Sequence, residues 1–172
     1  MAECRELHKA CGSALMSNWV KTLANGWCTS GRVHEDIRLP CIFGCQSAPD
    51  DFSHYLVCDI LWNMLRKHFR EYISHLPQTR LALPFPTPYN VLIVGCAFHT
   101  YHSLKIGSRE VVDEAIRTFE FEKVLSLASE TLSDLLLHMA TKSFTNIRRS
   151  TCMGPLITTL RQFFFPGMLA LR

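Results

Sequence analysis

The chain has 172 residues, a hydrophobic content of 48% and a formal net charge of +3 at pH 7. This composition excludes wholesale disorder, because a disordered chain has too few apolar side chains to build a core. The mild positive charge permits contact with phosphate groups but does not require it. No stretch reaches the roughly 18 uninterrupted apolar residues of a membrane-spanning helix, so we expect no membrane contact.

The first predicted element is a helix over about residues 13–27. Large apolar side chains recur there at intervals of four residues and mark a buried face: Leu15, Trp19, Leu23 and Trp27. The turn-forming run Thr29-Ser30-Gly31 ends this pattern, and a polar stretch over residues 32–38 follows it.

The next feature is the motif C-x3-C-x8-H-x3-C, formed by Cys41, Cys45, His54 and Cys58. Thiolate and imidazole are ligands that Zn²⁺ prefers, and four of them complete a tetrahedral structural site with no position left for water. Gly44 lets the backbone turn so that the first two sulfur atoms converge. The spacing therefore predicts a structural zinc site rather than a catalytic one.

An alternative is that these four residues are ordinary buried cysteines and a hydrogen-bonded histidine, because cysteine is often buried. The spacing favours the metal. Disulfide bonds are the least favoured interpretation, since the N-terminal run Met1-Ala2-Glu3-Cys4-Arg5 lacks the apolar stretch of a signal peptide. We therefore expect a reducing intracellular compartment, nuclear or cytoplasmic, where Cys and His clusters bind metals or catalyse reactions.

A second helix is predicted after the motif's first cysteine pair. Pro49-Asp50-Asp51 supplies a turn and an N-cap. The helix carries both His54 and Cys58 on one face, one turn apart, and continues to about Tyr72.

The segment from Leu76 to Tyr89 contains four prolines: Pro77, Pro84, Pro86 and Pro88. Each proline removes a backbone donor and fixes its own φ, so we expect neither a regular helix nor a central strand. This segment is also the best internal boundary.

Two further helices are predicted beyond it. Asn90 caps the first, which covers about residues 91–106 and ends at Gly107, although residues 91–94 alone would equally suit a buried strand. The second and strongest helix, Ser108–Ser143, has an apolar stripe with charged residues largely on its other faces.

The sequence thus predicts a mostly α protein with a Cys2HisCys zinc knuckle. We divide it into a helix plus zinc-knuckle region over residues 1–76, a proline-rich linker over residues 77–89 and a helical region over residues 90–172. In the last region, glycine–proline pairs interrupt the tail and Phe163–Phe165 forms a docking patch. The sequence leaves open whether the two larger regions pack together.

Other chemistry-bearing residues are weaker candidates. His99 and His102 lie three residues apart, with Cys96 three residues before, but their apolar neighbours favour packing over a second metal site. Cys28 and His34 are not assigned as ligands, because a second zinc would need another full quartet. No phosphate-binding loop, nucleophile elbow or H-E-x-x-H motif occurs, so we expect no enzymatic activity.

Basic residues gather around the zinc motif: Arg32, Arg38, Arg66, Lys67 and Arg70. Aromatic residues are interleaved with them: Trp27, Phe43, Tyr55 and Trp62. Cations that contact phosphates and rings that stack on bases suit a single-stranded nucleic acid. The sequence equally allows the rings to pack beneath the metal loop while the cations only solvate the surface.

A longer pattern runs through this region, from Leu23-Ala24-Asn25-Gly26-Trp27-Cys28-Thr29-Ser30-Gly31-Arg32 through Leu39-Pro40-Cys41, Cys45, His54-Tyr55-Leu56 and Cys58 to Leu61-Trp62. It resembles the zinc-binding region that follows the polymerase domain in reverse transcriptases of non-LTR retrotransposons. In that family a helix ends in a Thr/Arg-type turn. A cysteine pair, an acidic spacer, His-x-Leu, a final cysteine and a nearby tryptophan follow.

The resemblance covers about residues 15–70 and implies that the four motif residues bind zinc, with Trp62 packing beside them. Its three-residue gaps, between the first two cysteines and between His54 and Cys58, depart from the commonest spacing in the family. The chain has no polymerase segment with Tyr-x-Asp-Asp-type carboxylates and no nuclease constellation. The resemblance therefore implies a retroelement-derived fragment without polymerase activity of its own.

From these features we expect a zinc-binding protein that binds RNA or single-stranded DNA, with the five basic residues contacting phosphates. Two alternatives stay open. One is a protein-interaction scaffold that uses the Ser108–Ser143 helix and the Phe163–Phe165 patch, with a purely structural zinc. The other is a retroelement remnant without a selected role.

Overall fold

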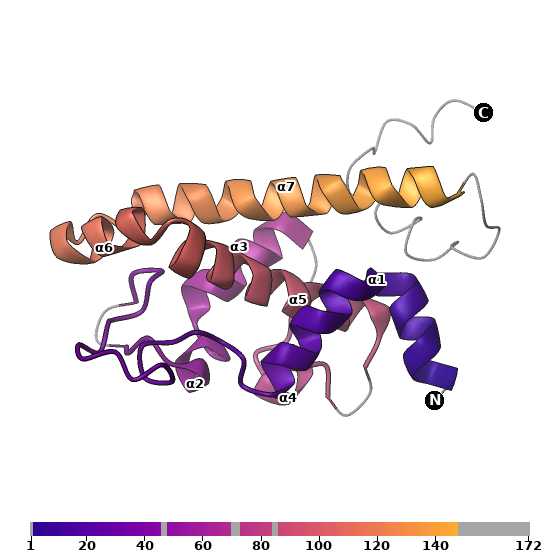
Figure 1. Cartoon of the computed structure of the whole chain (residues 1–172), viewed down its shortest axis with the longest axis horizontal. Helices are drawn as coiled ribbons and strands as arrows, with labels where there is room; N and C mark the ends of the chain where they lie inside the picture. Colours follow the sequence, from indigo (N-terminus) through magenta and orange to yellow (C-terminus); the bar gives the residue numbers. More distant parts are fainter. Residues whose placement is uncertain (1, 46–47, 70–72, 84–85, 148–172) are drawn as a thin grey trace.

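The structure is a computed structural model, and it describes residues 2–45, 48–69, 73–83 and 86–147. Over these residues the protein is built from α-helices and one π-helix (Figure 1). Within the described residues, the extended backbone forms one isolated antiparallel bridge, between Pro40 and Pro49. The prediction of a mostly α protein is confirmed.

Helix α1, Ala2–Leu23, contains a kink at Gly12, where φ is +78°. The helix begins well before the predicted residue 13. Of the side chains predicted for its buried face, Leu15 and Trp19 are buried, whereas Leu23 is 41% exposed; Leu7 and Cys11 extend the buried face at the same spacing of four. The predicted end at Trp27 is wrong. Asn25 has a positive φ of 51°, and the Gly26 N–H donates to the carbonyl of Lys21, so the helix stops before Trp27.

Helices α2, Phe52–Tyr55, and α3, Asp59–Phe69, replace the single helix predicted after residue 51. Asp51 is the N-cap of α2, as predicted: its side chain accepts from the His54 N–H at 2.9 Å. The chain then leaves the helical path at residues 56–58. The carbonyl of Cys58 accepts from the Trp62 N–H at 3.1 Å and starts α3. His54 and Cys58 therefore do not share one helix, and Tyr72 lies outside the described residues.

Helix α4, Pro77–Arg80, lies inside the proline-containing segment, so the prediction that this segment holds no helix is wrong there. Pro77 occupies the first turn, where a missing N–H removes no hydrogen bond within the helix. Prolines there start helices instead of interrupting them. The carbonyls of Ser74 and Leu56 accept hydrogen bonds from the buried side chain of Arg80 at 2.8 and 2.6 Å.

Helix α5, Pro88–His102, follows the same rule, with Pro88 in its first turn. Its N-cap is Thr87, whose hydroxyl accepts from the Asn90 N–H at 3.1 Å, so the predicted cap at Asn90 is wrong. The alternative of a strand over residues 91–94 is also wrong. The helix continues into the π-helix η1, Ser103–Gly107, and ends at Gly107 as predicted.

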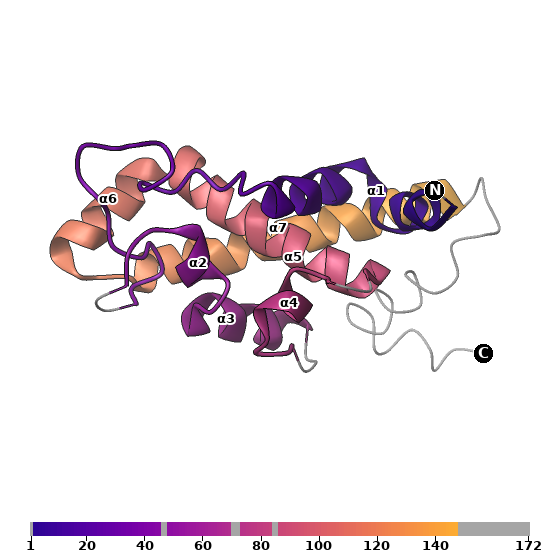
Figure 2. The same ribbon diagram turned by 90° about the horizontal axis from the view of Figure 1, so that it is seen from below.

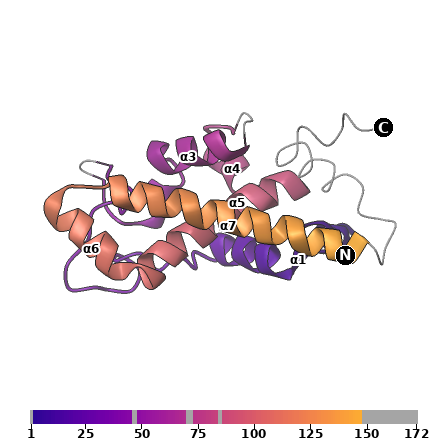
Figure 3. The same ribbon diagram turned by 90° about the horizontal axis from the view of Figure 1, so that it is seen from above.

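Helices α6, Arg109–Thr118, and α7, Glu122–Ile147, replace the single predicted helix Ser108–Ser143. Phe119 breaks it, because its φ of 60° lies in the left-handed region. Figure 3 shows α7 running across α5, with α3 and α4 on one side and α1 and α6 on the other. Its core contacts again recur every four residues: Val124, Ala128, Leu132 and Leu136.

Helix α5 is the centre of the core, and every side chain of residues 91–98 is buried. Helix α1 packs along it, and α3, α4 and α7 also contact it. Residues from both sides of the proline segment therefore share one hydrophobic core, which the sequence had left open. The division of the chain into domains stays a prediction.

The glycine–proline breaks predicted in the tail and the predicted Phe163–Phe165 patch lie outside the described residues. Among the residues that are described, no helix combines the length and apolar character needed to cross a membrane.

Candidate metal centre

Cys41, Cys45, His54 and Cys58 converge in the structure, and we call them the ligand cluster. One ligand atom from each lies within 4.8 Å of the others. The Cys58 sulfur is 3.9 Å from that of Cys41 and 3.5 Å from that of Cys45. Two of the cysteines, Cys41 and Cys58, are buried. These four side chains could bind one metal ion.

A tight turn brings the first two cysteines together. The Gly44 N–H donates to the carbonyl of Cys41 at 3.1 Å, and the Cys41 N–H donates to the carbonyl of Ala48 at 2.8 Å. Gly44 has a φ of +87°, which favours glycine because L side chains rarely adopt it. The bridge between Pro40 and Pro49 closes the base of this loop.

The other two ligands come from the ends of two short elements. His54 lies in α2, which Asp51 caps, and Cys58 immediately precedes α3. The break between the helices lets the Cys58 sulfur approach the cysteine pair. The sequence thus predicted four residues that do lie close together, although it placed the last two on one continuous helix.

The Nε2 atom of His54 is buried and has no hydrogen-bond partner among the described residues. An unsatisfied buried nitrogen is costly, and such atoms in folded proteins normally have a partner. A metal ion held between this imidazole and the three sulfurs would provide one. The donor set therefore fits a metal better than it fits a purely apolar packing of cysteines.

The pKa values of the three thiols in the cluster are shifted in different directions. A hydrogen bond from Cys58 lowers the pKa of Cys41 to about 5, although burial opposes this. The same hydrogen bond raises the pKa of Cys58, and burial and the charge on Cys41 add to the effect. Burial, followed by the charge on Cys41, raises the pKa of Cys45. Three thiolates this close repel one another, and a cation would remove that repulsion.

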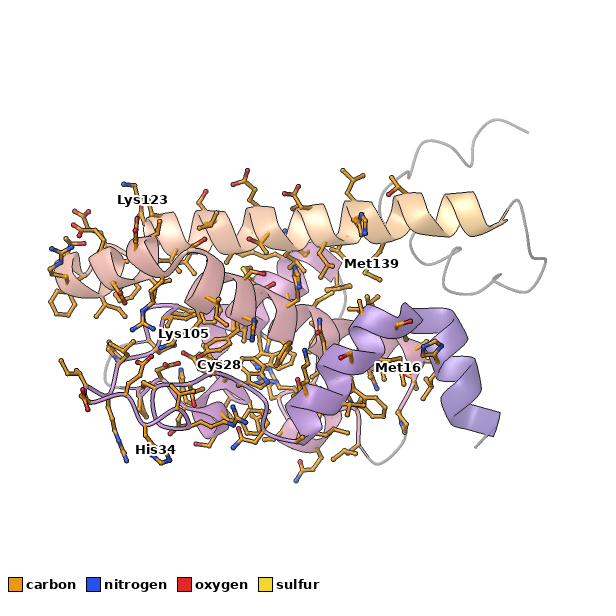
Figure 4. The ribbon with its side chains drawn as sticks, in the orientation of Figure 1. Met16, Cys28, His34, Lys105, Lys123 and Met139 are labelled. Atoms are coloured by element: carbon orange, nitrogen blue, oxygen red, sulfur yellow. The ribbon has the colours of Figure 1, made fainter. Side chains whose placement is uncertain are left out.

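A buried carboxylate anchors the ligand loop to the helical core. Asp50, which is 1% exposed, accepts hydrogen bonds from the hydroxyls of Tyr55 and Tyr101 at 2.7 and 2.9 Å. Its second oxygen accepts from the Ser30 N–H and from Lys105 Nζ, both at 2.8 Å. Figure 4 shows Lys105 between the ribbon of η1 and the loop beneath it.

The tyrosine hydroxyls in this network stay protonated. Burial and then the charge of Asp50 raise the pKa of both Tyr55 and Tyr101. They can therefore act as donors at any ordinary pH. Sequence reasoning assigned Asp50 only to a turn, and nothing local in the sequence indicates that it would receive a lysine 55 residues away.

The aromatic residues near the motif are buried. Trp27, Phe43, Tyr55 and Trp62 are each at most 1% exposed, and Trp27 stacks on Tyr55 with ring centroids 5.3 Å apart. Buried rings cannot stack on bases. Their burial contradicts the interpretation in which these rings stack on bases and agrees with the alternative in which they pack in the core.

The basic residues lie on two segments. Arg32 and Arg38 are exposed in the loop between α1 and the first cysteine, whereas Lys67 is exposed and Arg66 half-buried on α3. Figure 2 shows that loop and α3 on opposite sides of α2. The guanidinium of Arg66 contacts Asn63 and His75. Arg70 lies outside the described residues.

A second metal site is not formed by the histidines of α5. Among the described residues, three or more side chains of the types that bind metals come together at the ligand cluster alone. Cys96 is buried in the core, and His102 instead faces Cys28, with their ring nitrogen and sulfur 3.6 Å apart.

Comparison with known proteins adds no assignment: no protein-family model, curated protein or solved structure matches this chain.

Proposed function

We propose that the ligand cluster holds one zinc ion with a structural role. Two sulfur atoms bound at about 2.3 Å in a tetrahedral site lie about 3.8 Å apart, close to the 3.9 and 3.5 Å between Cys58 and the two other cysteines. Three thiolates and one imidazole also match the preference of Zn²⁺ for soft and borderline ligands. Four protein ligands leave no coordination position for a substrate.

We further propose that this zinc-stapled helical protein binds RNA or single-stranded DNA through the phosphate backbone. The support is electrostatic: Arg32, Arg38 and Lys67 are exposed on the two segments that flank α2 in the chain, the loop after α1 and helix α3. Because the aromatic rings are buried, the binding rests on cations and is independent of base sequence.

The sequence resemblance to the zinc-binding region of non-LTR retrotransposon reverse transcriptases supports the same proposal. The residues that carry it are the ligand cluster and Trp62, whose indole N–H donates to the Tyr55 carbonyl at 2.9 Å beneath the metal loop. We propose that the chain is a fragment derived from such an enzyme and has no polymerase activity of its own.

The experiment is a titration of the full chain with fluorescent single-stranded RNA at several salt concentrations. Each neutralised phosphate on a single strand contributes about −0.7 to the slope of log K against log salt. Replacing both Arg32 and Arg38 with glutamine should weaken binding and reduce that slope by about 1.4. The matched control replaces Arg117 and Lys123, which are exposed on α6 and α7, and should leave the slope unchanged.

A protein-interaction scaffold is the second candidate, and specific side chains favour it. Phe119 and Ile37 are 82% and 75% exposed. Ile37 lines a cleft of about 530 Å³ between the loop and α6, with Glu35, Asp36 and Asp113 in its wall. Absence of RNA binding at low salt, in protein that carries its full metal content, would reject the nucleic-acid proposal and favour this scaffold.

A further inference from the structure

A thiol and an imidazole face each other outside the ligand cluster. Cys28 follows the end of α1, and its sulfur lies 3.6 Å from Nε2 of His102 at the end of α5. Both side chains are half-buried, so solvent reaches them. Figure 4 shows Cys28 near the middle of the molecule, where the loop passes α5.

Neighbouring contacts hold both partners in place. The carbonyl of Cys28 accepts a hydrogen bond from the Tyr101 hydroxyl at 3.1 Å, and the same hydroxyl contacts Asp50. The His102 ring stacks on Phe98, with centroids 5.2 Å apart and an angle of 24° between the planes. The short separation of the sulfur and the nitrogen is therefore set by the surrounding fold on both sides.

Burial, assisted by a nearby positive charge, keeps the imidazole of His102 neutral near pH 7. Burial and then the positive charge of Lys21 on α1 lower the pKa of His102. Lys21 lies over the Phe98 ring, 5.9 Å from its centroid. His99, one turn earlier on α5, also has a lowered pKa, through burial and then the charge of His102. A neutral imidazole next to a thiol can accept its proton.

The other described cysteines differ from Cys28. Burial raises the pKa of Cys11 to about 11 and that of Cys96 still further. The remaining three belong to the ligand cluster. Among the six cysteines that the structure describes, Cys28 thus combines access to solvent, an adjacent base and a position outside the metal centre.

We propose that Cys28 and His102 form a reactive thiol–imidazole pair and that Cys28 is a covalent modification site for α,β-unsaturated carbonyl compounds. The Cys28 thiol transfers its proton to Nε2 of His102, and the thiolate attacks the β-carbon of the electrophile. A carbon–sulfur bond forms while the electrons of the carbon–carbon double bond move to the carbonyl oxygen. The α-carbon then takes up the proton from the imidazolium. Nothing is oxidised or reduced, and no group leaves.

The test uses N-ethylmaleimide, a member of this class, on the zinc-loaded full chain. Mass spectrometry of peptides from quenched samples gives a rate constant for each cysteine. Cys28 should react at least about tenfold faster than Cys11 in the same sample, because burial and the raised pKa protect Cys11. Replacing His102 with glutamine should slow Cys28 about tenfold or more at pH 7.

A matched control replaces His99, which contacts the Ser103 hydroxyl rather than Cys28, and should change the Cys28 rate constant by less than about twofold. The pH profile separates an acting base from a structural role. The wild-type rate should change as His102 titrates below the ordinary histidine range, and the His102→Gln variant should lack that inflection.

Two results would overturn the proposal. One is a Cys28 rate in the folded chain no higher than in the same chain unfolded in urea. The other is an unchanged pH profile after the His102 substitution. The first comparison needs no variant, so the proposal stays testable even if His102→Gln does not fold.

Discussion

The ring of Phe121 covers the α-carbon of Gly44, so that a β-carbon added to Gly44 would lie 2.6 Å from Cγ of that ring. Gly44 belongs to the turn between Cys41 and Cys45, and Phe121 precedes α7. The metal loop is therefore seated directly against the turn that connects α6 and α7. This contact requires a residue without a side chain at that position.

Replacing Gly44 with alanine should destabilise the protein by about 1–3 kcal/mol, because alanine combines a positive φ with a clash against the ring. Metal affinity should fall with it. Urea unfolding and a competition titration with a chelator would measure both effects. Gly31→Ala is the matched control: no atom lies within 4 Å of the added carbon, so equal destabilisation by both variants would contradict this account.

Replacing Cys45 with serine should lower the ratio of bound metal to protein. It should also unfold residues 28–70 locally, since metal binding in small zinc modules contributes on the order of 10 kcal/mol to folding. Elemental analysis gives the ratio, and hydrogen exchange locates the unfolding. Cys28→Ser, which alters a thiol outside the ligand cluster, should retain the wild-type ratio. An unchanged ratio in Cys45→Ser would refute the site.

Metal binding should release about two protons at pH 7, and affinity should rise with pH. Cys45 and Cys58 have raised pKa values, so both are protonated at pH 7 before the metal binds and must lose a proton to coordinate it. Cys41, with a pKa of about 5, is already ionised. Calorimetry in buffers of different ionisation enthalpy counts the protons. Binding with no proton release would show that the thiols do not coordinate the ion.

Replacing Asp50 with asparagine should cost about 3 kcal/mol, because it removes the 2.8 Å carboxylate partner of the buried Lys105 ammonium and leaves only Glu35, at 3.4 Å, to pair with that charge. Adding Lys105→Met to that variant should restore part of the loss, since the buried charge that has lost its shorter ion pair is then removed. Thermal or urea unfolding of the two single variants and the double variant measures the coupling. Asp36→Asn, at an exposed carboxylate, serves as control and should change little.

The convergence of Cys41, Cys45, His54 and Cys58 was predictable, because the four residues lie within eighteen positions of one another and are all of a type that binds metals. Helical periodicity was equally visible in α1 and α7, where buried residues recur every four positions. The helix ends were less predictable. Phe119 adopts a left-handed backbone conformation that nothing in its side chain favours. Because the apolar stripe continues beyond Phe119, the sequence pattern predicts one helix where the structure has α6 and α7.

The supporting shell of the site was not predictable, because its contacts join distant parts of the chain. Asp50 meets Tyr101 and Lys105, residues that are 51 and 55 positions away. Sequence patterns report which side chains are apolar, but they do not report which charged groups meet inside the core. The burial of Trp27 and Trp62 was unpredictable for a related reason. An aromatic residue next to a basic one gives the same sequence pattern whether its ring faces solvent or packs in the core.

The pairing of α1 with α5 has a kinetic consequence. These helices are neighbours in space, yet residues 24–87 separate them in sequence, so they can meet only after that connection has left the ribosome. An ion that joins Cys41 to Cys58 shortens the connection, and each halving of a flexible loop lowers its closure cost by about 0.6 kcal/mol. Metal supply during synthesis would thus accelerate docking of the first helix and shorten the time for which its apolar face stays uncovered.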